Sequence, residues 1–338
     1  MKKVIIRGKK LAEIVEVQNP SSQGDWALVK IIVAPMCTEY KSYNSGEECE
    51  CLGHEAAGEV VEADQSGQVR VGDRVVVMPQ YPCLRCELCL AGEYIHCENV
   101  IDIKEYTGSS EGAETYAQYI LKPASLLPKI PDHISFEHAS MLCCGLGPTF
   151  GAMQRTGVDS FDTILITGLG PVGLGGVING VFRGARVIGV SANGYRSRLA
   201  MELGADQIIN PEDGDSAEQI MELTHGKGVD AAIECAGDEA AQILCIESTR
   251  RNGHVAFVGE SGTLNVNVSD QLIRNGLTLH GIWHYNLNDI PKVFKVVEEC
   301  SGMLDKMITH KFPLDKVENA WELQTTRQCG KVLLYPWD

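Results

Sequence analysis

Four cysteines within fifteen residues, Cys83, Cys86, Cys89 and Cys97, have a spacing that suits a metal ion. Four thiolates complete a tetrahedral shell with no open position, which is typical of a structural zinc. Thiolate is a soft ligand and also fits an iron–sulfur cluster. The bacterial ferredoxin pattern, however, ends in a short gap and Cys-Pro, whereas here Glu98 follows the last cysteine. The spacing predicts a structural zinc lobe over about residues 80–100. Taken alone, the lobe also fits a small zinc-ribbon interaction module.

A glycine turn with the pattern G-x-G-x-x-G lies between a segment that predicts a strand (163–167) and one that predicts a helix (172–182). This is the context in which such a turn binds a dinucleotide. Gly168 permits the tight turn, Gly170 lets the backbone approach a pyrophosphate, and Gly173 lets helix and strand pack closely. The helix N-terminus offers unpaired N–H groups to the phosphates. The candidate cofactor-binding residues here are Gly168, Gly170, Pro171, Val172 and Gly173. The alternative is a glycine loop without a ligand.

The end of the next predicted strand bears on which dinucleotide binds. An NAD site usually has an acidic residue about 20 residues along, which binds the ribose hydroxyls. Here Ser191 stands in that place. A carboxylate would repel a 2′-phosphate, whereas a serine hydroxyl can donate to it and Arg196 or Arg198 can neutralise it. The sequence therefore favours NADP over NAD. The alternative is that Ser191 tolerates NAD and both arginines are solvated.

The segments around these motifs are of two kinds. The first ~135 residues contain short β-branched runs separated by glycine, proline and acidic turns. From about residue 140, strands alternate with helices, which indicates parallel βαβ units in a doubly wound sheet. Its expected strands are 163–167, 186–190, 207–209, 229–234, 254–258 and 278–281, with helices at 172–182 and 196–203. The last ~45 residues do not extend this pattern, so we expect them, with a final strand at 331–335, to return to the first domain.

Composition restricts the class of protein. A chain of 338 residues, 44% hydrophobic and 22% charged, predicts a soluble protein of two domains. Its net charge of −16 disfavours nucleic acid and acidic membranes as partners. No apolar run reaches the roughly 20 residues of a membrane span, and early charges disfavour a signal peptide. We therefore expect a cytoplasmic protein. Without export, its thirteen cysteines predict thiols, and we expect four scattered ones to be small buried hydrophobes: Cys235, Cys245, Cys300 and Cys329.

These motifs, with the run GHEAAGEV at 53–60 and the run ELGAD at 202–206, resemble those of the medium-chain, zinc-dependent alcohol dehydrogenases. This group includes polyol and sorbitol-type dehydrogenases, and the resemblance covers nearly the whole chain. It implies an α/β fold with a GroES-like, β-rich catalytic domain built from both chain ends (1–138 and 292–338). A Rossmann domain with a doubly wound parallel sheet would occupy 139–291. It also implies a homodimer or homotetramer.

The resemblance implies a second, catalytic zinc, and thus two zinc ions per chain. Its ligands would be Cys37, His54 and a third residue from a Cys-Cys-Gly run, for which we prefer Cys144 and keep Cys143 as the alternative. Two cysteines and one histidine are the ligand set of the catalytic zinc in alcohol dehydrogenases. Glu55 would either approach the metal as an alternative ligand or support the site without touching it.

The implied chemistry is hydride transfer between a substrate carbon and a nicotinamide. A zinc with an open position would act as a Lewis acid on the alcohol oxygen. Thr38 is the implied proton relay, although the family's Cys-x-Thr/Ser-Asp stretch is one residue shorter here, ending at Glu39. Lys331 falls where family members often place a basic residue facing the pyrophosphate, with a solvated lysine as the alternative. Two nearby thiols, Cys49 and Cys51, are incidental loop residues or competing metal ligands.

We thus predict a zinc-dependent dehydrogenase acting on a small, secondary or polyol-like alcohol, or its carbonyl form, with NADP or NAD. One alternative is a zinc-free quinone or enoyl reductase of the same superfamily. It is disfavoured because such enzymes lack both the Gly-His-Glu run and the cysteine lobe. The other alternative is a nucleotide-binding sensor or scaffold with an altered catalytic site. Metal content separates the three hypotheses. The dehydrogenase would hold two zinc ions per chain, the zinc-free reductase none, and the sensor one.

Overall fold

The computed structural model describes residues 1–338 and divides into two compact units. The first unit contains Met1–Gly145, Asn286–Glu298 and Ile308–Asp338, and the second contains Leu146–Tyr285 and Glu299–Met307. The first unit is thus assembled from both ends of the chain. No helix in the structure combines the length and the apolar character that crossing a bilayer requires.

The unit boundaries differ from the expected breaks after residues 138 and 291. Residues 139–145 belong to the first unit, where the Cys143 thiol donates to the Val77 carbonyl at 3.3 Å. Residues 286–291 also join it, because the Asn286 side chain donates to the Ala91 carbonyl at 2.8 Å. Residues 299–307 instead belong to the second unit, where the Lys306 ammonium donates to the carbonyl of Glu202. Such side-chain anchors are not visible in a hydropathy pattern.

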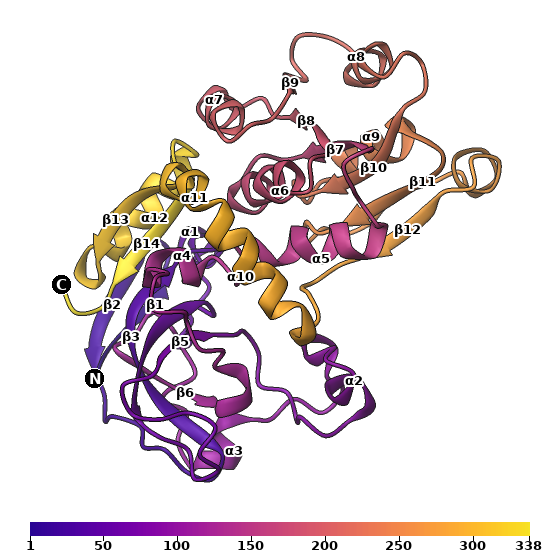
Figure 1. Cartoon of the computed structure of the whole chain (residues 1–338). Coiled ribbons are helices and arrows are strands. Elements are labelled where there is room, and N and C mark those ends of the chain that lie inside the picture. The colour runs from indigo at the N-terminus through magenta and orange to yellow at the C-terminus, as the bar shows by residue number, and fades with distance from the viewer. The chain divides into compact units, whose positions relative to one another are not determined.

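The first unit is built on antiparallel strands around β3 (Trp26–Pro35). This strand pairs with β4 (Ala56–Glu62) and β6 (Tyr119–Pro123), and near its end with β14 (Lys331–Tyr335). The final strand therefore joins the first unit. The sheet continues on one side through β5 (Arg74–Val77) and on the other through β13 (Ile308–Pro313). These strands bring segments from both chain ends into one apolar core (Figure 1).

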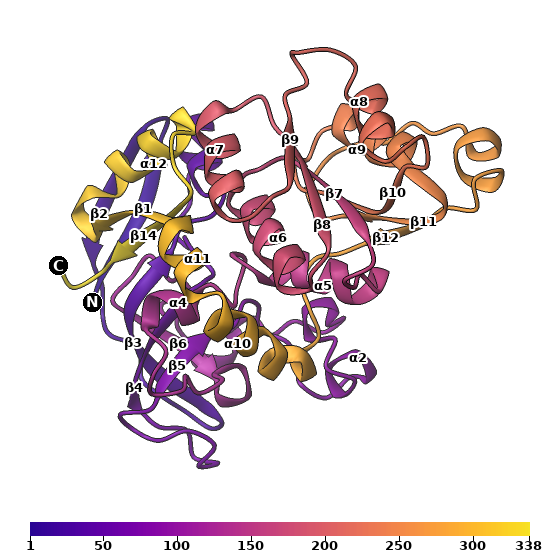
Figure 2. The same ribbon diagram turned by 45° about the horizontal axis from the view of Figure 1, so that its top comes forward.

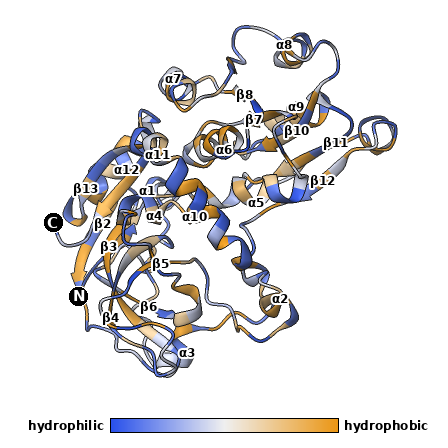
Figure 3. Cartoon of the chain, in the orientation of Figure 1, coloured by the Kyte–Doolittle hydropathy of each residue, from blue (hydrophilic) through white to orange (hydrophobic).

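The remaining elements of the first unit are short. A separate hairpin consists of β1 (Lys2–Gly8) and β2 (Leu11–Glu16). The helices are α1 (Tyr40–Ser45), α2 (Glu87–Leu90), α3 (Ile103–Thr107), α4 (Phe136–Ser140), α10 (Ile290–Glu299) and α12 (Val317–Thr326). Helix α10 is amphipathic, with alternating hydrophilic and hydrophobic faces in Figure 3, and buries Val293, Val296 and Val297. Its valines follow the three-and-four spacing that places side chains on one helix face.

The second unit contains a six-stranded parallel sheet in the order β12-β11-β10-β7-β8-β9 (Figure 2). After β7, the chain adds β8 and β9 on one side of this strand and then β10, β11 and β12 on the other. The strand order therefore reverses between β7 and β10. This confirms the doubly wound sheet. Its strands are β7 (Thr163–Thr167), β8 (Arg186–Val190), β9 (Gln207–Ile209), β10 (Val229–Glu234), β11 (Thr249–Phe257) and β12 (Thr278–Gly281).

Helices connect these strands, and their caps explain where they begin. Helix α6 starts at Pro171, which lacks the N–H that the first helical turn leaves unpaired. Helix α7 starts two residues earlier than expected, because the Asn193 side chain caps it by accepting from the Arg196 amide. The helices of this unit are α5 (Gly147–Thr156), α6 (Pro171–Phe182), α7 (Gly194–Glu202), α8 (Ser216–Leu223), α9 (Glu239–Ser248) and α11 (Ser301–Met307).

Candidate active site

Four side chains of the first unit place their ligand atoms within 4.8 Å of one another: Cys37, His54, Glu55 and Cys144. Cys37 follows β3, His54 and Glu55 directly precede β4, and Cys144 follows α4. The His54 Nε2 atom lies 3.2 Å from the Cys144 sulfur. Two thiols and an imidazole form a donor set that zinc favours. Residues from distant parts of the chain therefore converge on one candidate metal site, which we call the catalytic cluster.

The charge states within this cluster are strongly coupled. A hydrogen bond with Cys144, together with His54 and Lys331, holds the pKa of the Cys37 thiol well below its usual value. The same thiol pair, together with burial, raises the pKa of Cys144. Cys37 is therefore the more acidic thiol of the pair. A divalent cation would favour the thiolate form of both, because metal ligands bind deprotonated.

Glu39 orients the histidine of the catalytic cluster. Its carboxylate lies 3.0 Å from His54 Nδ1, and it also accepts from the Tyr116 hydroxyl at 2.8 Å and from the Cys37 amide at 3.1 Å. Although burial opposes ionisation, the bonds with His54 lower the pKa of Glu39 to about 2. A carboxylate on one ring nitrogen fixes the ring so that the other faces a metal. The sequence alone did not reveal this role, and its only signal was the acidic residue closing the shortened Cys37–Glu39 stretch.

Glu55 is bound on both carboxylate oxygens. One oxygen lies 2.7 Å from the Lys331 ammonium and the other accepts from the Cys144 amide at 3.1 Å. Glu55 and Lys331 are 0% and 1% exposed, which shows that Lys331 is not a solvated lysine. A buried charge is tolerated when it is paired and hydrogen-bonded. The pair ties β14, at the C-terminal end of the chain, to the segment that carries His54.

The structure separates the alternative cysteines. Cys143 is fully buried and its thiol faces the Val77 carbonyl, so it lies outside the catalytic cluster while Cys144 lies within it. Cys49 donates to the carbonyl of Cys51, and neither belongs to a metal-binding group. Of the four scattered cysteines, three are buried as expected, namely Cys245, Cys300 and Cys329, and Cys235 is half-buried.

Thr38 lies between Cys37 and Glu39 and is exposed to solvent. Its carbonyl accepts from the Lys41 amide at 2.8 Å, at the start of α1. Its hydroxyl forms no hydrogen bond with the residues of the catalytic cluster. The position next to Cys37 and the exposure fit a group at the boundary between site and water.

The four cysteines of the lobe, Cys83, Cys86, Cys89 and Cys97, also place their sulfur atoms within 4.8 Å of one another. The Cys97 sulfur accepts from the amides of Cys83 at 3.2 Å and Asn99 at 3.3 Å. Backbone N–H groups, first that of Arg85, lower the pKa of the Cys83 thiol to about 6. Such donors favour thiolate, the form that binds metal. The lobe thus forms a compact four-sulfur group from one short segment.

The glycine turn lies at the carboxyl end of β7 in the second unit. Gly168 has φ +77°, and a Cβ there would lie 2.5 Å from the Ala236 nitrogen. A Cβ at Gly173 would collide with the Gly168 carbonyl oxygen. At Gly170, by contrast, the only atom near a Cβ would be Arg196 Nη1, at 3.7 Å. Two glycines are therefore required by close packing, and the third leaves open backbone where α6 begins at Pro171 and Val172.

Ser191 follows β8 on the same edge of the sheet. Its hydroxyl accepts from the Asn193 amide at 3.1 Å, and Asn193 in turn caps α7 at Arg196. Since the Arg196 guanidinium reaches the space beside Gly170, the serine, the arginine and the glycine turn share one corner of the second unit. Ligands of doubly wound sheets bind at the carboxyl ends of the strands where the order reverses.

Comparison with known proteins gives matches over nearly the whole chain. The model "Alcohol dehydrogenase GroES-like domain" matches residues 23–132, and the model "Zinc-binding dehydrogenase" matches residues 171–299. A sorbitol dehydrogenase of Bacillus subtilis is 32% identical, with 99% of this chain and 97% of that protein covered. An L-threonine 3-dehydrogenase of Pyrococcus abyssi is also 32% identical, with 95% and 94% covered.

Solved structures agree with these matches. Alcohol dehydrogenase TADH from Thermus sp. ATN1 superposes with a TM-score of 0.89 at 25% identity, covering 99% of each chain. A structure described as "short chain alcohol dehydrogenase (rspB) from E. coli CFT073", complexed with NADH, gives a TM-score of 0.84 at 25% identity, again covering 99% of each chain. These likenesses extend over both units and thus identify the first as GroES-like and the second as Rossmann-like.

Proposed function

Because the chain belongs to the zinc-dependent medium-chain alcohol dehydrogenase family, we propose that it transfers a hydride between NADP and a small secondary or polyol-like alcohol, or its carbonyl form. The observation that carries this proposal is the convergence of Cys37, His54 and Cys144 into a donor set of two thiols and one imidazole. The chain is an oxidoreductase by family. The cofactor preference, the metal count and the substrate class are the proposed parts.

Each donor set would hold one zinc ion, giving two per chain. Cys37, His54 and Cys144 would hold the catalytic zinc, and the lobe cysteines Cys83, Cys86, Cys89 and Cys97 the structural one. The catalytic ion, when bound, supplies a Lewis acid for the substrate oxygen. A zinc-free reductase would not need either group of metal ligands. A sensor with an altered site remains the second candidate, which the shortened Cys37–Glu39 stretch favours.

The surrounding residues would hold this site in one arrangement. Glu39 fixes the His54 ring through Nδ1, so that Nε2 points toward Cys144. Glu55 supports the site without acting as a ligand: the Lys331 ammonium neutralises its charge, and Lys331 and the Cys144 amide each bind one of its oxygens. Thr38 passes the alcohol proton to water, as its exposed position beside Cys37 allows.

The proposed cofactor preference depends on Ser191 and Arg196. A guanidinium beside Gly170 and a serine hydroxyl at the end of β8 suit a 2′-phosphate, and no carboxylate stands at the Ser191 position to repel it. The pyrophosphate would lie on the glycine turn at the start of α6. The nicotinamide is the hydride carrier of this reaction. One similar structure carries NADH, so the preference needs a direct test.

The proposed substrate class follows from the relatives. One relative is named for sorbitol and the other for dehydrogenation of L-threonine at its 3-position. Both named substrates are small molecules that carry hydroxyl groups. A dehydrogenase of this class needs no macromolecular partner for the reaction. We further propose a homodimer or homotetramer and a cytoplasmic location.

A panel of secondary alcohols, polyols and their carbonyl forms, assayed with NAD(H) and NADP(H), tests the proposal. We expect turnover of a secondary alcohol with kcat/KM at least tenfold higher for NADP than for NAD, and loss of that preference in Arg196→Gln. Arg198→Gln, on the same helix, separates the two candidate arginines, and Arg274→Gln, at an exposed arginine paired with Asp270, is the matched control. A tenfold preference for NAD would contradict the cofactor assignment. No turnover of any alcohol, together with one zinc ion per chain, would favour the sensor.

A further inference from the structure

Glu234, the last residue of β10, has a fully buried side chain inside the second unit. One carboxylate oxygen, Oε1, accepts from the amides of Ala236 at 2.5 Å and Gly237 at 2.7 Å. Because backbone N–H groups need acceptors, these two bonds hold the turn that follows the strand. The carboxylate therefore fixes the path of residues 235–237, which we call the β10 turn.

The β10 turn lies directly beside the glycine turn. Ligands of doubly wound sheets bind outside the carboxyl ends of the strands where the order reverses, which here is between β7 and β10. The Cys235 amide donates to the carbonyl of Thr167, the last residue of β7, at 2.9 Å. A Cβ on Gly168 would lie 2.5 Å from the Ala236 nitrogen and 2.6 Å from its Cα. A displacement of the β10 turn would therefore displace Gly168 as well.

A third segment, which follows β11, packs against the same residues. The amides of Val258 and Gly259 donate to the Glu234 carbonyl at 2.9 and 3.0 Å. A Cβ on Gly259 would lie 2.4 Å from the Gly237 nitrogen and 2.8 Å from Glu234 Oε2. Close-packed segments of this kind transmit a displacement to one another. Glu234 therefore lies where the segments after β10 and β11 meet, next to the glycine turn.

The burial of this carboxyl group is costly. Burial raises the pKa of Glu234, although the amides of Gly237 and Ala236 oppose the rise. The second oxygen, Oε2, has no hydrogen-bond partner within the chain, since the Gly259 amide beside it donates to the Glu234 carbonyl instead. A buried polar atom without a partner costs folding free energy and calls for an explanation. The two bonds to the β10 turn provide one.

We propose that Glu234 is a positioning residue for the bound dinucleotide. Its carboxylate holds the β10 turn against Gly168, so that the glycine turn and the first amides of α6 keep the spacing that the phosphates need. Glu234 is buried and acts through Ala236, which is exposed at this end of the sheet. The inference deepens the proposed function and rests on its dinucleotide site.

Calorimetric titration of the full chain with NADPH and with NADH, without substrate, tests the proposal. Glu234→Met keeps the length of the side chain but removes the acceptor, so we expect Kd to rise at least about tenfold for both dinucleotides. Glu234→Gln keeps an acceptor oxygen and should stay within about threefold of the wild type. Because the catalytic cluster belongs to the first unit, zinc content and kcat at saturating cofactor should change little in either variant.

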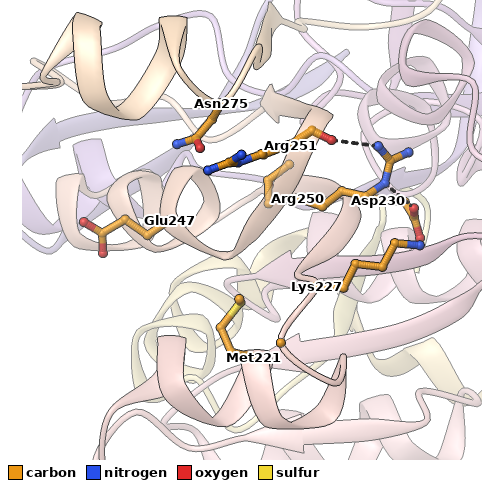
Figure 4. Close-up of a pocket in the computed structure, with 9 residues that line it drawn as sticks. Met221, Lys227, Asp230, Glu247, Arg250, Arg251 and Asn275 are labelled. Carbon is orange, nitrogen blue, oxygen red and sulfur yellow. Dashed lines mark hydrogen bonds and ion pairs between the residues drawn. The ribbon is translucent and has the colours of Figure 1, made fainter.

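Asp230, near the start of the same strand, offers a matched control. Its carboxylate also accepts from a backbone amide, that of Thr163 at 2.8 Å, and from Arg250 Nε at 2.5 Å. Figure 4 shows this pair in a pocket of about 570 Å³. Four residues of strand, roughly 13 Å, separate Asp230 from Glu234. Asp230→Leu should lower the melting temperature, as Glu234→Met does, but leave both Kd values unchanged.

Three results would overturn the inference alone while the wild type binds a dinucleotide. These are unchanged Kd values in Glu234→Met, an equal loss of affinity in Asp230→Leu, and a loss in Glu234→Gln as large as that in Glu234→Met. A wild type that binds neither dinucleotide would overturn the proposed function and this inference with it.

Hydrogen exchange of the wild type provides a measurement that does not depend on the folding of a variant. NADPH should slow amide exchange in residues 168–170 and in the β10 turn together, because the two segments are in contact. Slower exchange at the glycine turn with no change in the β10 turn would overturn the positioning role.

Discussion

The catalytic cluster and the cysteine lobe contain similar donors but are assembled differently. The lobe collects four sulfur atoms from residues 83–97, whereas the cluster joins Cys37, His54 and Cys144 from three separate segments. Backbone amides surround the lobe sulfurs, whereas charged side chains hold the cluster: the half-buried Glu39 contacts His54, and the buried Lys331 pairs with Glu55. A local site depends mainly on its own segment, whereas a dispersed site depends on the whole fold of the first unit.

Removal of a cluster ligand should have the largest effect on activity. His54→Ala leaves two thiols, which no longer provide the three protein ligands of a catalytic zinc. We expect kcat/KM to fall by at least about 10³-fold, since the Lewis acid is lost. Elemental analysis should show one zinc per chain in place of two. Cys49→Ala, a cysteine outside both groups, should keep two zinc ions and full activity.

Disruption of the lobe should instead lower stability first. Cys86→Ser removes one sulfur from a closed four-ligand site, and binding free energy of a structural metal contributes to folding. We expect a melting temperature lower by several degrees, since about 1 kcal/mol corresponds to roughly 2–4 °C in larger domains. The catalytic zinc should remain. If Cys86→Ser kept the wild-type melting temperature, the lobe would not be a stabilising metal site.

Glu39 provides a finer test of the dispersed site. Glu39→Gln keeps the shape but removes the charge that holds the His54 ring, so we expect a roughly 10–100-fold loss of zinc affinity or activity. Glu39→Asp shortens the side chain, and in the shortened Cys37–Glu39 stretch it should not reach His54 fully. Zinc affinity from chelator competition separates this effect from a folding defect. If Glu39→Gln bound zinc as tightly as the wild type, the positioning role would be refuted.

The buried lysines Lys122 and Lys331 differ in their partners, and this difference can be tested through the pH dependence of stability. Lys331 has Glu55 as a partner, whereas Lys122 is 2% exposed and its ammonium lies over the Tyr81 ring at 3.8 Å. Burial lowers the pKa of Lys122 to about 7. Between pH 7 and about 10 the unfolded chain thus binds more protons than the folded chain, so stability should rise with pH by up to about 1.4 kcal/mol per unit.

Lys122→Met should abolish that part of the pH dependence and stabilise the protein at pH 7. Chemical unfolding at pH 7, 8 and 9 measures both effects. Lys129→Met, at an exposed lysine, is the matched control. A wild-type stability that falls with pH over this range, or an identical profile in Lys122→Met, would contradict the effect assigned to burial.

The sequence predicted the regular and the local parts of the molecule well. The strands 163–167, 186–190, 207–209, 229–234, 278–281 and 331–335 occur with the expected bounds. Four of them are buried apolar runs, whereas 207–209 and 278–281 are the less buried strands at the two edges of the parallel sheet. Strand β11 begins five residues earlier than expected, at Thr249, because the polar residues Arg250, Arg251 and Asn252 hide its start. Spacing alone identified the lobe cysteines as a group.

The dispersed site could be predicted only through resemblance to a family. Nothing local indicates that Cys144 reaches His54 while Cys143 faces Val77, since adjacent side chains in an irregular segment diverge by packing alone. The roles of Glu39 and Lys331 likewise depend on contacts between segments far apart in the chain. Buried partners of this kind leave no spacing pattern in a single sequence.

Anomalous diffraction from a crystal of the wild-type protein, measured above and below the zinc absorption edge, tests most directly whether both donor sets hold zinc. We predict two peaks per chain, one among the lobe sulfurs and one contacted by Cys37, His54 and Cys144. A single peak at the lobe from zinc-supplemented protein, with the side chains of Cys37 and His54 directed apart, would contradict the assignment of a catalytic zinc.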